Sequence, residues 1–286
     1  MLTLTSNGYE LSLDPEHGGV VTALSFLGLP ILRGAKGLNL VGPKSSACFP
    51  LVPFSNRIHQ ARFSYARAVY QLGQNDAGDP HALHGDGWQS RWRVGTQTDQ
   101  SCEMWYDGGA NWPWHYLASQ KIDIRADGVW FRLAIENTSA SPFPAGLGFH
   151  PYFPRVCDTQ VQFDAKGTLR PGLFQTRQLD ALAPDQQFHV ARTLRDTDLD
   201  HCYFGWARRA IITQPRTGLA IELSTPSPTE WCTVYAPPRA DFFCIEPVSH
   251  ATGAFNRLDQ ADEGVKILAP GDTFEFEMRL SAAAVQ

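Results

Sequence analysis

The chain has 286 residues and a formal net charge of −5, with 43% hydrophobic and 19% charged residues. This composition is typical of a globular protein with a sizeable core, and all-β domains of this length are commonly single. A negative net charge disfavours nucleic-acid and anionic-membrane partners, because both attract basic surfaces. We therefore expect one domain over residues 1–286 that binds neither.

The N-terminal residues contain no basic region followed by an apolar one, so no signal peptide is expected. No apolar run approaches the roughly 20 residues that a membrane-spanning helix needs. The six cysteines are scattered without a CxxC pair: Cys48, Cys102, Cys157, Cys202, Cys232 and Cys244. This spacing favours reduced, mostly buried thiols and a cytoplasmic location over disulfides or a zinc site.

Apolar residues alternate with polar ones from the start of the chain. Residues 2–13 read as a hairpin around Asn7-Gly8, residues 122–135 repeat the pattern, and residues 274–280 close the chain with it. Further strands are predicted at 63–70, 91–96, 210–213, 219–223 and 231–235. We find no long segment with a period of 3.6 residues, and 185–194 is at best a short helical turn. The pattern predicts an all-β fold, a large antiparallel β-sandwich.

An apolar run at 241–245 predicts a buried strand that delivers Glu246 and is stopped by Pro247. Removing a carboxylate from water costs several kcal/mol unless partners compensate. Glu246 therefore either has a cationic partner or lies at the mouth of a cavity. An apolar pocket would raise its pKa and make it a usable general base near neutral pH. The alternative is a strand-end Glu that has reached solvent.

His150 lies among aromatic and small residues, and Pro151 follows it without a backbone donor. A histidine in such a pocket can titrate close to the working pH and donate a proton during a reaction. A satisfied core histidine is the alternative interpretation.

Other polar side chains occur beside turns or apolar runs. Asn56 and Arg57 follow a proline-broken apolar run, and the planar fork of Arg57 can grip vicinal hydroxyls or a carboxylate. His81 and His84 lie in a Gly-rich loop, where the backbone can approach a ligand closely. Asp200 leads directly into an apolar strand and could accept hydrogen bonds from sugar hydroxyls. The alternative for each of these residues is an exposed side chain with no functional role.

A metal site is a poor fit to this sequence. His81 and His84 are close, but Asp86 is no characteristic third ligand, and there is no His-Glu-x-x-His helix. A phosphate-binding glycine loop and a Gly-x-Ser-x-Gly elbow are also absent.

Five segments in order resemble the aldose 1-epimerase (galactose mutarotase) family. They are Pro53-Phe54-Ser55-Asn56-Arg57-Ile58, Leu83-His84-Gly85, His150-Pro151-Tyr152-Phe153, Leu199-Asp200-His201, and Glu246-Pro247 with His250 and Ala254-Phe255-Asn256. The resemblance implies a twisted antiparallel β-sandwich with an open sugar-binding cleft. It also implies a reaction with no metal or organic cofactor.

By position, the resemblance implies that Glu246 is the general base and His150 the general acid. His84 then corresponds to a second histidine near the ring oxygen of the sugar. Arg57 and Asp200 match residues that bind hydroxyls, with Asn56 as a neighbour. The loop after His84 is compact, which leaves the identity of the sugar open.

The resemblance predicts interconversion of the α and β anomers of a free aldohexose by a monomer or homodimer. A charged hexose, phosphorylated or sulfonated, would need a cationic pocket. Candidates for it are Arg62, Arg67, Arg91, Arg93 and Arg239. A non-catalytic carbohydrate-binding domain is a third possibility, whereas a glycosidase would use two carboxylates.

Overall fold

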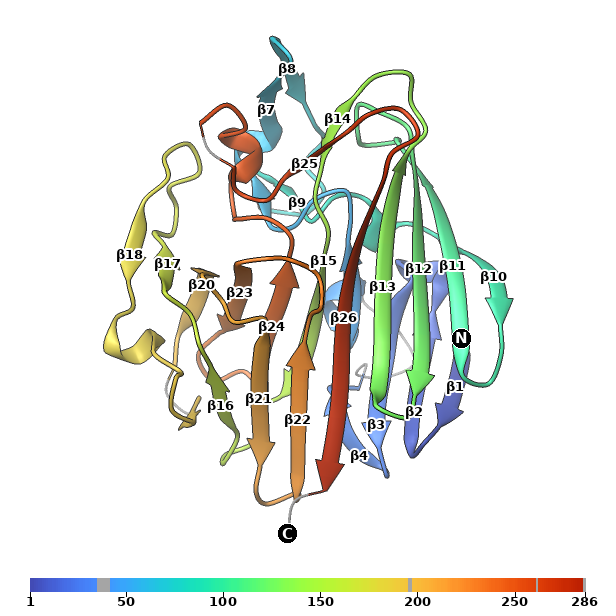
Figure 1. Cartoon of the computed structure of the whole chain (residues 1–286), viewed down its shortest axis with the longest axis vertical. Helices are drawn as coiled ribbons and strands as arrows, with labels where there is room; N and C mark the ends of the chain where they lie inside the picture. Colours follow the sequence, from blue (N-terminus) through green and yellow to red (C-terminus); the bar gives the residue numbers. More distant parts are fainter. Residues whose placement is uncertain (35–41, 195–196, 261, 285–286) are drawn as a thin grey trace.

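The computed structural model describes residues 1–34, 42–194, 197–260 and 262–284 (Figure 1). Within these ranges the chain is almost entirely strand, arranged as two large antiparallel sheets packed face to face and three two-stranded ribbons. This confirms the predicted β-sandwich.

In the described ranges the larger sheet has eleven strands and contains the N-terminal strands of the chain. In spatial order its strands are β1 (Leu2–Ser6), β2 (Tyr9–Asp14), β3 (Val20–Phe26), β5 (Cys48–Leu51), β15 (Gly148–Pro154), β24 (Phe242–Val248), β23 (Trp231–Ala236), β20 (Leu199–Phe204), β17 (Gly167–Leu169) and β18 (Leu179–Ala181), with β4 (Leu29–Leu32) paired to β3.

The second sheet has nine strands. Its order is β10 (Arg93–Gln97), β11 (Ser101–Gly108), β12 (Tyr116–Arg125), β13 (Gly128–Asn137), β26 (Thr273–Ala284), β22 (Leu219–Ser224), β21 (Arg209–Gln214), β16 (Gln160–Phe163) and β19 (Arg192–Thr193). The ribbons pair β6 (Arg57–Ile58) with β9 (Ala82–Leu83), β7 (Arg62–Tyr65) with β8 (Ala68–Gln71), and β14 (Phe143–Ala145) with β25 (Lys266–Leu268). Six single 3₁₀ turns occupy Pro15–His17, Pro43–Ser45, His59–Ala61, Gly87–Gln89, Pro184–Gln186 and Ala254–Asn256.

The main core lies between the two large sheets, where apolar side chains from alternate strand positions meet. On β24, Phe243 and Ile245 belong to this core. Cys244 and Val248 belong to a second, smaller apolar cluster. Because successive side chains point to opposite faces, Glu246 shares the face of Cys244 and Val248. The strand thus turns its carboxylate away from the main core.

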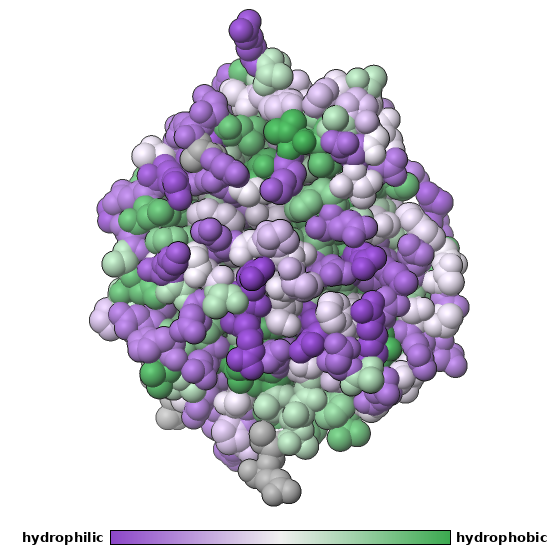
Figure 2. Space-filling model, in the orientation of Figure 1, coloured by the Kyte–Doolittle hydropathy of each residue, from purple (hydrophilic) through white to green (hydrophobic). Residues whose placement is uncertain are grey.

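The outer face of the nine-stranded sheet is mostly hydrophilic in Figure 2, in the view in which β13, β26 and β22 lie in front. Cross-strand ion pairs cover it, such as Arg132–Glu277 at 2.8 Å and Arg209–Glu222 at 2.7 Å. Such exposed pairs contribute little stability each. No helix in the described ranges is long and apolar enough to span a bilayer.

Two sequence predictions were wrong in detail. Residues 63–70 form the β7–β8 hairpin rather than one strand, because Ala66 and Arg67 both adopt positive φ, the geometry of a tight turn. Pro247 does not stop its strand, since β24 continues to Val248. The β15–β24 partners are Gly148 with Val248 and Tyr152 with Cys244, so Pro247 and its missing N–H lie in the interval between them.

Candidate functional site

Strand register places Glu246 opposite His150. Gly148 pairs with Val248 and Tyr152 with Cys244, so the position midway on β15 is His150 and the position midway on β24 is Glu246. Side chains of directly opposite residues lie on the same face of a sheet. The two residues singled out by sequence, almost a hundred positions apart, therefore meet on adjacent strands.

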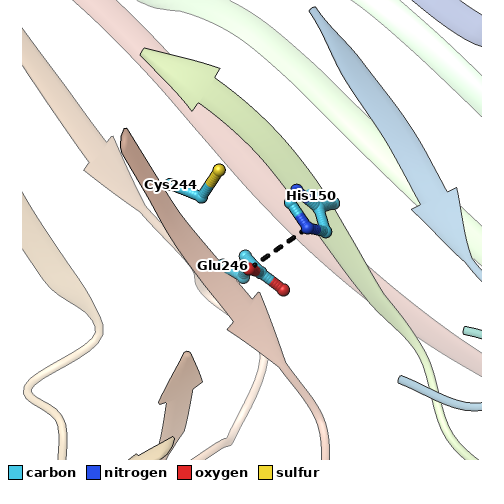
Figure 3. Close-up of side chains that lie close together, drawn as sticks. All are labelled: His150, Cys244 and Glu246. Carbon is cyan, nitrogen blue, oxygen red and sulfur yellow. Dashed lines mark ion pairs between the residues drawn. The ribbon is translucent and has the colours of Figure 1, made fainter. Parts of the chain in front are cut away.

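The Nε2 atom of His150 lies 3.3 Å from Oε1 of Glu246 (Figure 3). Both side chains are buried, with exposed fractions of 8% and 3%. Burial raises the pKa of Glu246 well above its usual value; Asp200 adds to the rise and Arg57 opposes it. Burial also lowers the pKa of His150 to about 3. Burial therefore disfavours the charged form of each group, and the two titrate as a coupled pair.

The imidazole of His150 packs against two aromatic rings. Its centroid lies 4.5 Å from that of Phe49 and 4.6 Å from that of Tyr152, with both rings nearly parallel to it. The guanidinium of Arg33 covers Tyr152 at 3.6 Å. The Nδ1 atom of His150 is buried and has no hydrogen-bond partner. Packing therefore fixes the ring, while one of its nitrogens remains unsatisfied.

His84 is held by the β6–β9 ribbon beside this pair. The N–H of Asn56 donates to Nδ1 of His84 at 3.0 Å, and the N–H of His84 donates to the carbonyl of Asn56 at 2.9 Å. Burial lowers the pKa of His84 well below its usual value, so the ring is neutral. Because Nδ1 accepts, Nε2 carries the proton and is the donor. The ring centroid lies 5.3 Å from that of His150.

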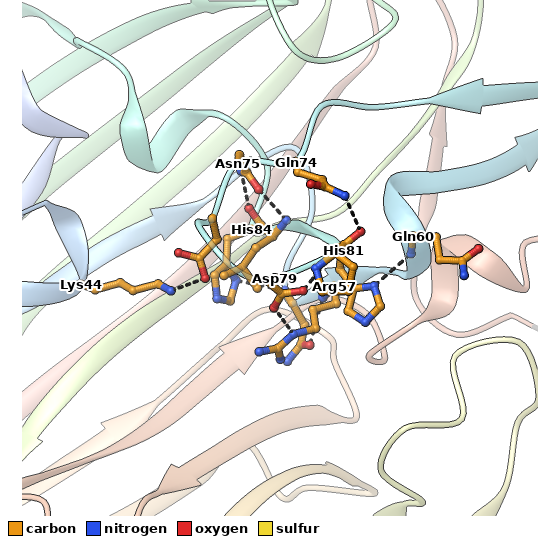
Figure 4. Close-up of polar contacts among 12 residues, drawn as sticks. Lys44, Arg57, Gln60, Gln74, Asn75, Asp79, His81 and His84 are labelled. Carbon is orange, nitrogen blue, oxygen red and sulfur yellow. Dashed lines mark hydrogen bonds and ion pairs between the residues drawn. The ribbon is translucent and has the colours of Figure 1, made fainter.

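Arg57 is anchored by Asp79, a residue that the sequence interpretation missed (Figure 4). Its Nε donates to Oδ2 of Asp79 at 2.8 Å, and the N–H of His81 donates to Oδ1 at 2.9 Å. Burial raises the pKa of Asp79, but these hydrogen bonds outweigh it and leave the pKa below its usual value. The signal available in the sequence was the Gly-Asp-Pro turn two residues before His81.

A pocket of about 190 Å³ opens between the β6 segment, the β17–β18 loop and β20, and neither His150 nor Glu246 is among its lining residues. Its lining residues are Asn56, Arg57, His81, Leu169, Arg170, Pro171, Gly172, Leu173, Phe174, Asp200, Cys202 and Thr252. Three predicted binding residues, Asn56, Arg57 and Asp200, are thus brought to one pocket. His84 is hydrogen-bonded to the lining residue Asn56, and the charges of Asp200 and Arg57 act on Glu246, but His84 and Glu246 do not themselves line the pocket.

Comparison with known proteins shows the family of the chain. A model of the family "Aldose 1-epimerase" matches residues 1–281. The chain belongs to the aldose 1-epimerase family. It is 32% identical to the uncharacterised protein YphB of Escherichia coli K12, over 97% of each chain. A solved structure from the same organism, provisionally named an aldose 1-epimerase, is 30% identical and superposes with a TM-score of 0.90 over 99% and 98% of the two chains.

More distant structures share the fold. A galactose mutarotase-like protein from Clostridium acetobutylicum superposes with a TM-score of 0.88 at 18% identity, over 99% of this chain and 95% of its own. A galactose 1-epimerase from Lactobacillus acidophilus NCFM superposes with a TM-score of 0.76 at 14% identity, over 99% and 94%. Membership of the aldose 1-epimerases implies an isomerase.

The sequence analysis also did not predict the residues at the rim of the pocket. Leu173 and Phe174 come from the loop between β17 and β18, and Thr252 comes from the loop after β24. The buried guanidinium of Arg257 joins the two loops. It donates to the carbonyls of Phe174 at 2.6 Å, Leu173 at 3.3 Å and Thr252 at 2.9 Å. Irregular loops carry no periodic pattern, so neither loop could be assigned to the site from sequence.

Gly253 shows how closely these two loops approach each other. Its φ is +74°, and an added Cβ would lie 2.8 Å from Nη1 of Arg257 and 3.1 Å from Cα of Phe174. Glycine is the residue that accepts such a backbone at no steric cost. The close approach thus helps to define the rim of the pocket.

The cations suggested for a charged sugar do not line the pocket. Arg91 pairs with Glu16 and Arg93 pairs with Asp107, each at 2.8 Å. The lining also lacks Arg62, Arg67 and Arg239. Two guanidinium groups line the pocket, those of Arg57 and Arg170. Arg170 is paired with Asp180 at 2.8 Å.

Proposed function

We propose that the protein is an aldose 1-epimerase that interconverts the α and β anomers of a neutral, free aldohexose. The observation that carries the proposal is the buried contact of 3.3 Å between His150 and Glu246. A carboxylate and an imidazole in contact can accept one proton and donate another within a single site. Membership of the family supports the same assignment.

The reaction needs the two proton transfers that this pair can make. Glu246 removes the proton of the C1 hydroxyl while His150 gives a proton to the ring oxygen, and the C1–O5 bond breaks to leave an open-chain aldehyde. After rotation about C1–C2, the ring oxygen attacks the other face of the carbonyl. His150 then recovers its proton and Glu246 returns one to O1. No electrons are gained or lost. The cycle starts from the form of the pair in which Glu246 is ionised and the shared proton lies on His150, and transfer of that proton across the 3.3 Å contact supplies this form.

The surrounding residues have matching roles in this proposal. The Nε2–H of His84 would hydrogen-bond a sugar oxygen near the ring oxygen, since Nδ1 is already engaged by Asn56. Arg57, pre-oriented by Asp79, would donate to hydroxyls, and Asp200 would accept from them. The pocket is smaller than the roughly 300–1,000 Å³ typical of drug-sized ligands, which favours a monosaccharide.

The charge of the pocket favours a neutral sugar over a phosphorylated or sulfonated one. Both lining guanidiniums already have carboxylate partners, Arg57 in Asp79 and Arg170 in Asp180. Asp200 then contributes a negative charge to the same wall. An anionic sugar would have to compete with both ion pairs and face this carboxylate.

A binding module without catalysis is the less favoured alternative. Sugar binding needs hydroxyl partners and aromatic surface, whereas burying the Glu246 carboxyl against an unsatisfied imidazole carries a desolvation cost. A purely binding protein gains nothing from that cost.

Exchange NMR on a panel of free and phosphorylated aldoses tests the proposal. We expect the protein to accelerate exchange between the α and β C1–H signals of glucose or galactose, with little effect on hexose 6-phosphates. Failure to accelerate anomer exchange of any aldose would overturn the proposed activity. A strong preference for a 6-phosphate would overturn the neutral-sugar assignment alone.

A further inference from the structure

Cys244 adds a third potential metal ligand to the His150–Glu246 pair. It lies two residues before Glu246 on β24, so both side chains are on the same face of the strand. One donor atom from each of His150, Cys244 and Glu246 lies within 4.8 Å of the others, and all three residues are buried (Figure 3). The proposed proton transfers make no use of the thiol. The proposed function therefore leaves its position beside the pair unexplained.

Nitrogen, sulfur and carboxylate oxygen are the donors that Zn²⁺ takes in proteins. Its bonds to them are about 2.0–2.3 Å long, so neighbouring donors of a tetrahedral site lie roughly 3.3–3.8 Å apart. His150 and Glu246 already have this separation, at 3.3 Å. The sulfur of Cys244 has to move by about 1 Å or less, which a side-chain rotation supplies.

The charge balance suits a buried site. A thiolate and a carboxylate together carry two negative charges, which neutralise Zn²⁺, while the imidazole binds through a lone pair. The complex is then neutral overall, and a neutral group avoids most of the cost of burial in a low-dielectric environment. Hard cations such as Mg²⁺ prefer six oxygen ligands and are a poor match to this donor set.

We propose that His150, Cys244 and Glu246 form an inhibitory site for Zn²⁺ or a similar borderline-soft divalent cation. Binding forms three metal–ligand bonds and releases two protons to solvent: the thiol proton of Cys244 and the proton shared by His150 and Glu246. The three protein ligands leave one tetrahedral position for water or a sugar oxygen. The metal occupies the same lone pairs that the proposed reaction uses, so it blocks proton transfer.

The metal site itself depends only on geometry and donor chemistry, whereas the inhibition rests on the proposed function. Two measurements on the full chain separate them. Co²⁺ is the spectroscopic probe, because bound thiolate gives cobalt a sulfur-to-metal charge-transfer absorption. Zn²⁺, with Mg²⁺ as a control, is then titrated into the anomer-exchange assay.

We expect wild-type protein to show the cobalt–thiolate absorption and to lose anomer exchange on addition of Zn²⁺ but not Mg²⁺. Cys244→Ala should lose the absorption, keep basal exchange, and raise the Zn²⁺ concentration for half-inhibition by about 10- to 100-fold. The matched control is Cys232→Ala, a buried free thiol on the main-core side of the same sheet, which should behave like wild type. Cys244→Ser provides a second variant if the alanine protein does not fold.

Absence of the absorption in wild-type protein, or its persistence in both Cys244 variants, would overturn the metal site. Cobalt binding through Cys244 without any anomer exchange, with or without metal, would leave the site standing and reject the proposed activity instead. Inhibition by Zn²⁺ that is unchanged in the Cys244 variants would show that the metal acts elsewhere.

Discussion

Two buried acid–base pairs in this molecule are built in opposite ways. Arg257 and Glu263 are 0% and 1% exposed, and Oε2 of Glu263 accepts from Nε at 2.8 Å and Nη2 at 2.7 Å. The remaining donors of Arg257 reach the carbonyls of the pocket rim. His150 and Glu246 are almost as buried, but they meet through a single contact of 3.3 Å, and Nδ1 of His150 has no partner.

The difference separates a pair that holds structure from one that can move a proton. The guanidinium fork of Arg257 makes five acceptor contacts, with Glu263 and with the pocket rim, so this pair holds the two rim loops together. In the other pair, burial opposes both charged forms, so one proton is shared between groups whose pKa values have been pushed past each other. Incomplete satisfaction is costly to stability and useful for exchange.

Removing the base should have the largest effect. Glu246→Gln keeps the shape of the side chain but cannot accept a proton, so the accelerated rate of anomer exchange should fall by about 10²- to 10⁴-fold. Polarimetry on freshly dissolved α-D-glucose or α-D-galactose measures it. A wild-type rate in this variant would mean that Glu246 is not the base.

The thermal stability of the same variant provides its control. The pKa of Glu246 is raised in the folded state, so this group favours folding below its unfolded pKa of about 4.3 and loses that contribution as pH rises toward the folded value. The amide has no such dependence. Glu246→Gln should therefore melt at a higher temperature than wild type at pH 8, and a lower melting temperature would show that the loss of activity reflects damage to the fold.

Replacing the proposed acid should lower the rate by a similar or somewhat smaller factor, about 10²-fold or more. His150→Asn retains a polar group beside Phe49 and Tyr152 but removes the imidazole that would carry the proton. The variant is measured by exchange NMR over a range of sugar concentrations. A fall in kcat with little change in KM supports the acid role, whereas near-normal turnover would remove His150 from it.

Substitutions in the Arg257–Glu263 pair should change the stability of the protein rather than the chemical step. Arg257→Ala leaves the buried Glu263 carboxylate with only the partly exposed Arg177 at 3.4 Å, which should cost about 3–5 kcal/mol in the free energy of unfolding. Arg257→Lys keeps the charge but not the fork, so Leu173, Phe174 and Thr252 lose their common anchor and KM should rise more than kcat falls. Denaturant unfolding and steady-state kinetics test the two variants; an unchanged KM in Arg257→Lys would mean that the rim does not contact sugar.

Sequence alone predicted the strands and the identity of the proposed acid and base for one physical reason. Alternation reveals which residues face the core, and a charged or titratable residue inside an apolar run stands out, as Glu246 and His150 do. The resemblance to the aldose 1-epimerases added His84, Asn56, Arg57 and Asp200, three of which line the pocket.

The remaining parts of the site depend on contacts that leave no local trace. Asp79 and Arg257 act through partners 22 and about 80 positions away, and each reads locally as an ordinary loop residue. Pro247 was taken as a strand terminator because its missing N–H is unfavourable in a regular ladder, but the β15–β24 interval tolerates it. For Asp79 and Arg257, contacts between segments distant in sequence decide the role. For Pro247, the register between β15 and β24 decides it.

The pH profile sharpens the contrast between the two pairs. With its pKa lowered to about 3, His150 does not titrate in the neutral range, and the pair loses its proton only at the raised pKa of Glu246. The exchange rate should therefore show no inflection near the ordinary histidine pKa of about 6.5. A clear inflection there would indicate that His150 titrates alone.

The smallest effect is expected for Arg177, at the exposed edge of the Arg257–Glu263 pair. Nε of Arg177 lies 3.4 Å from Oε1 of Glu263, but its side chain is 41% exposed and Arg257 already engages the other carboxylate oxygen. Solvent screens such a contact, so Arg177→Gln should cost less than about 1 kcal/mol in the free energy of unfolding and leave KM unchanged. A cost comparable with that of Arg257→Ala would mean that Glu263 depends on both cations, and that the rim is held by a three-residue network rather than by the buried pair.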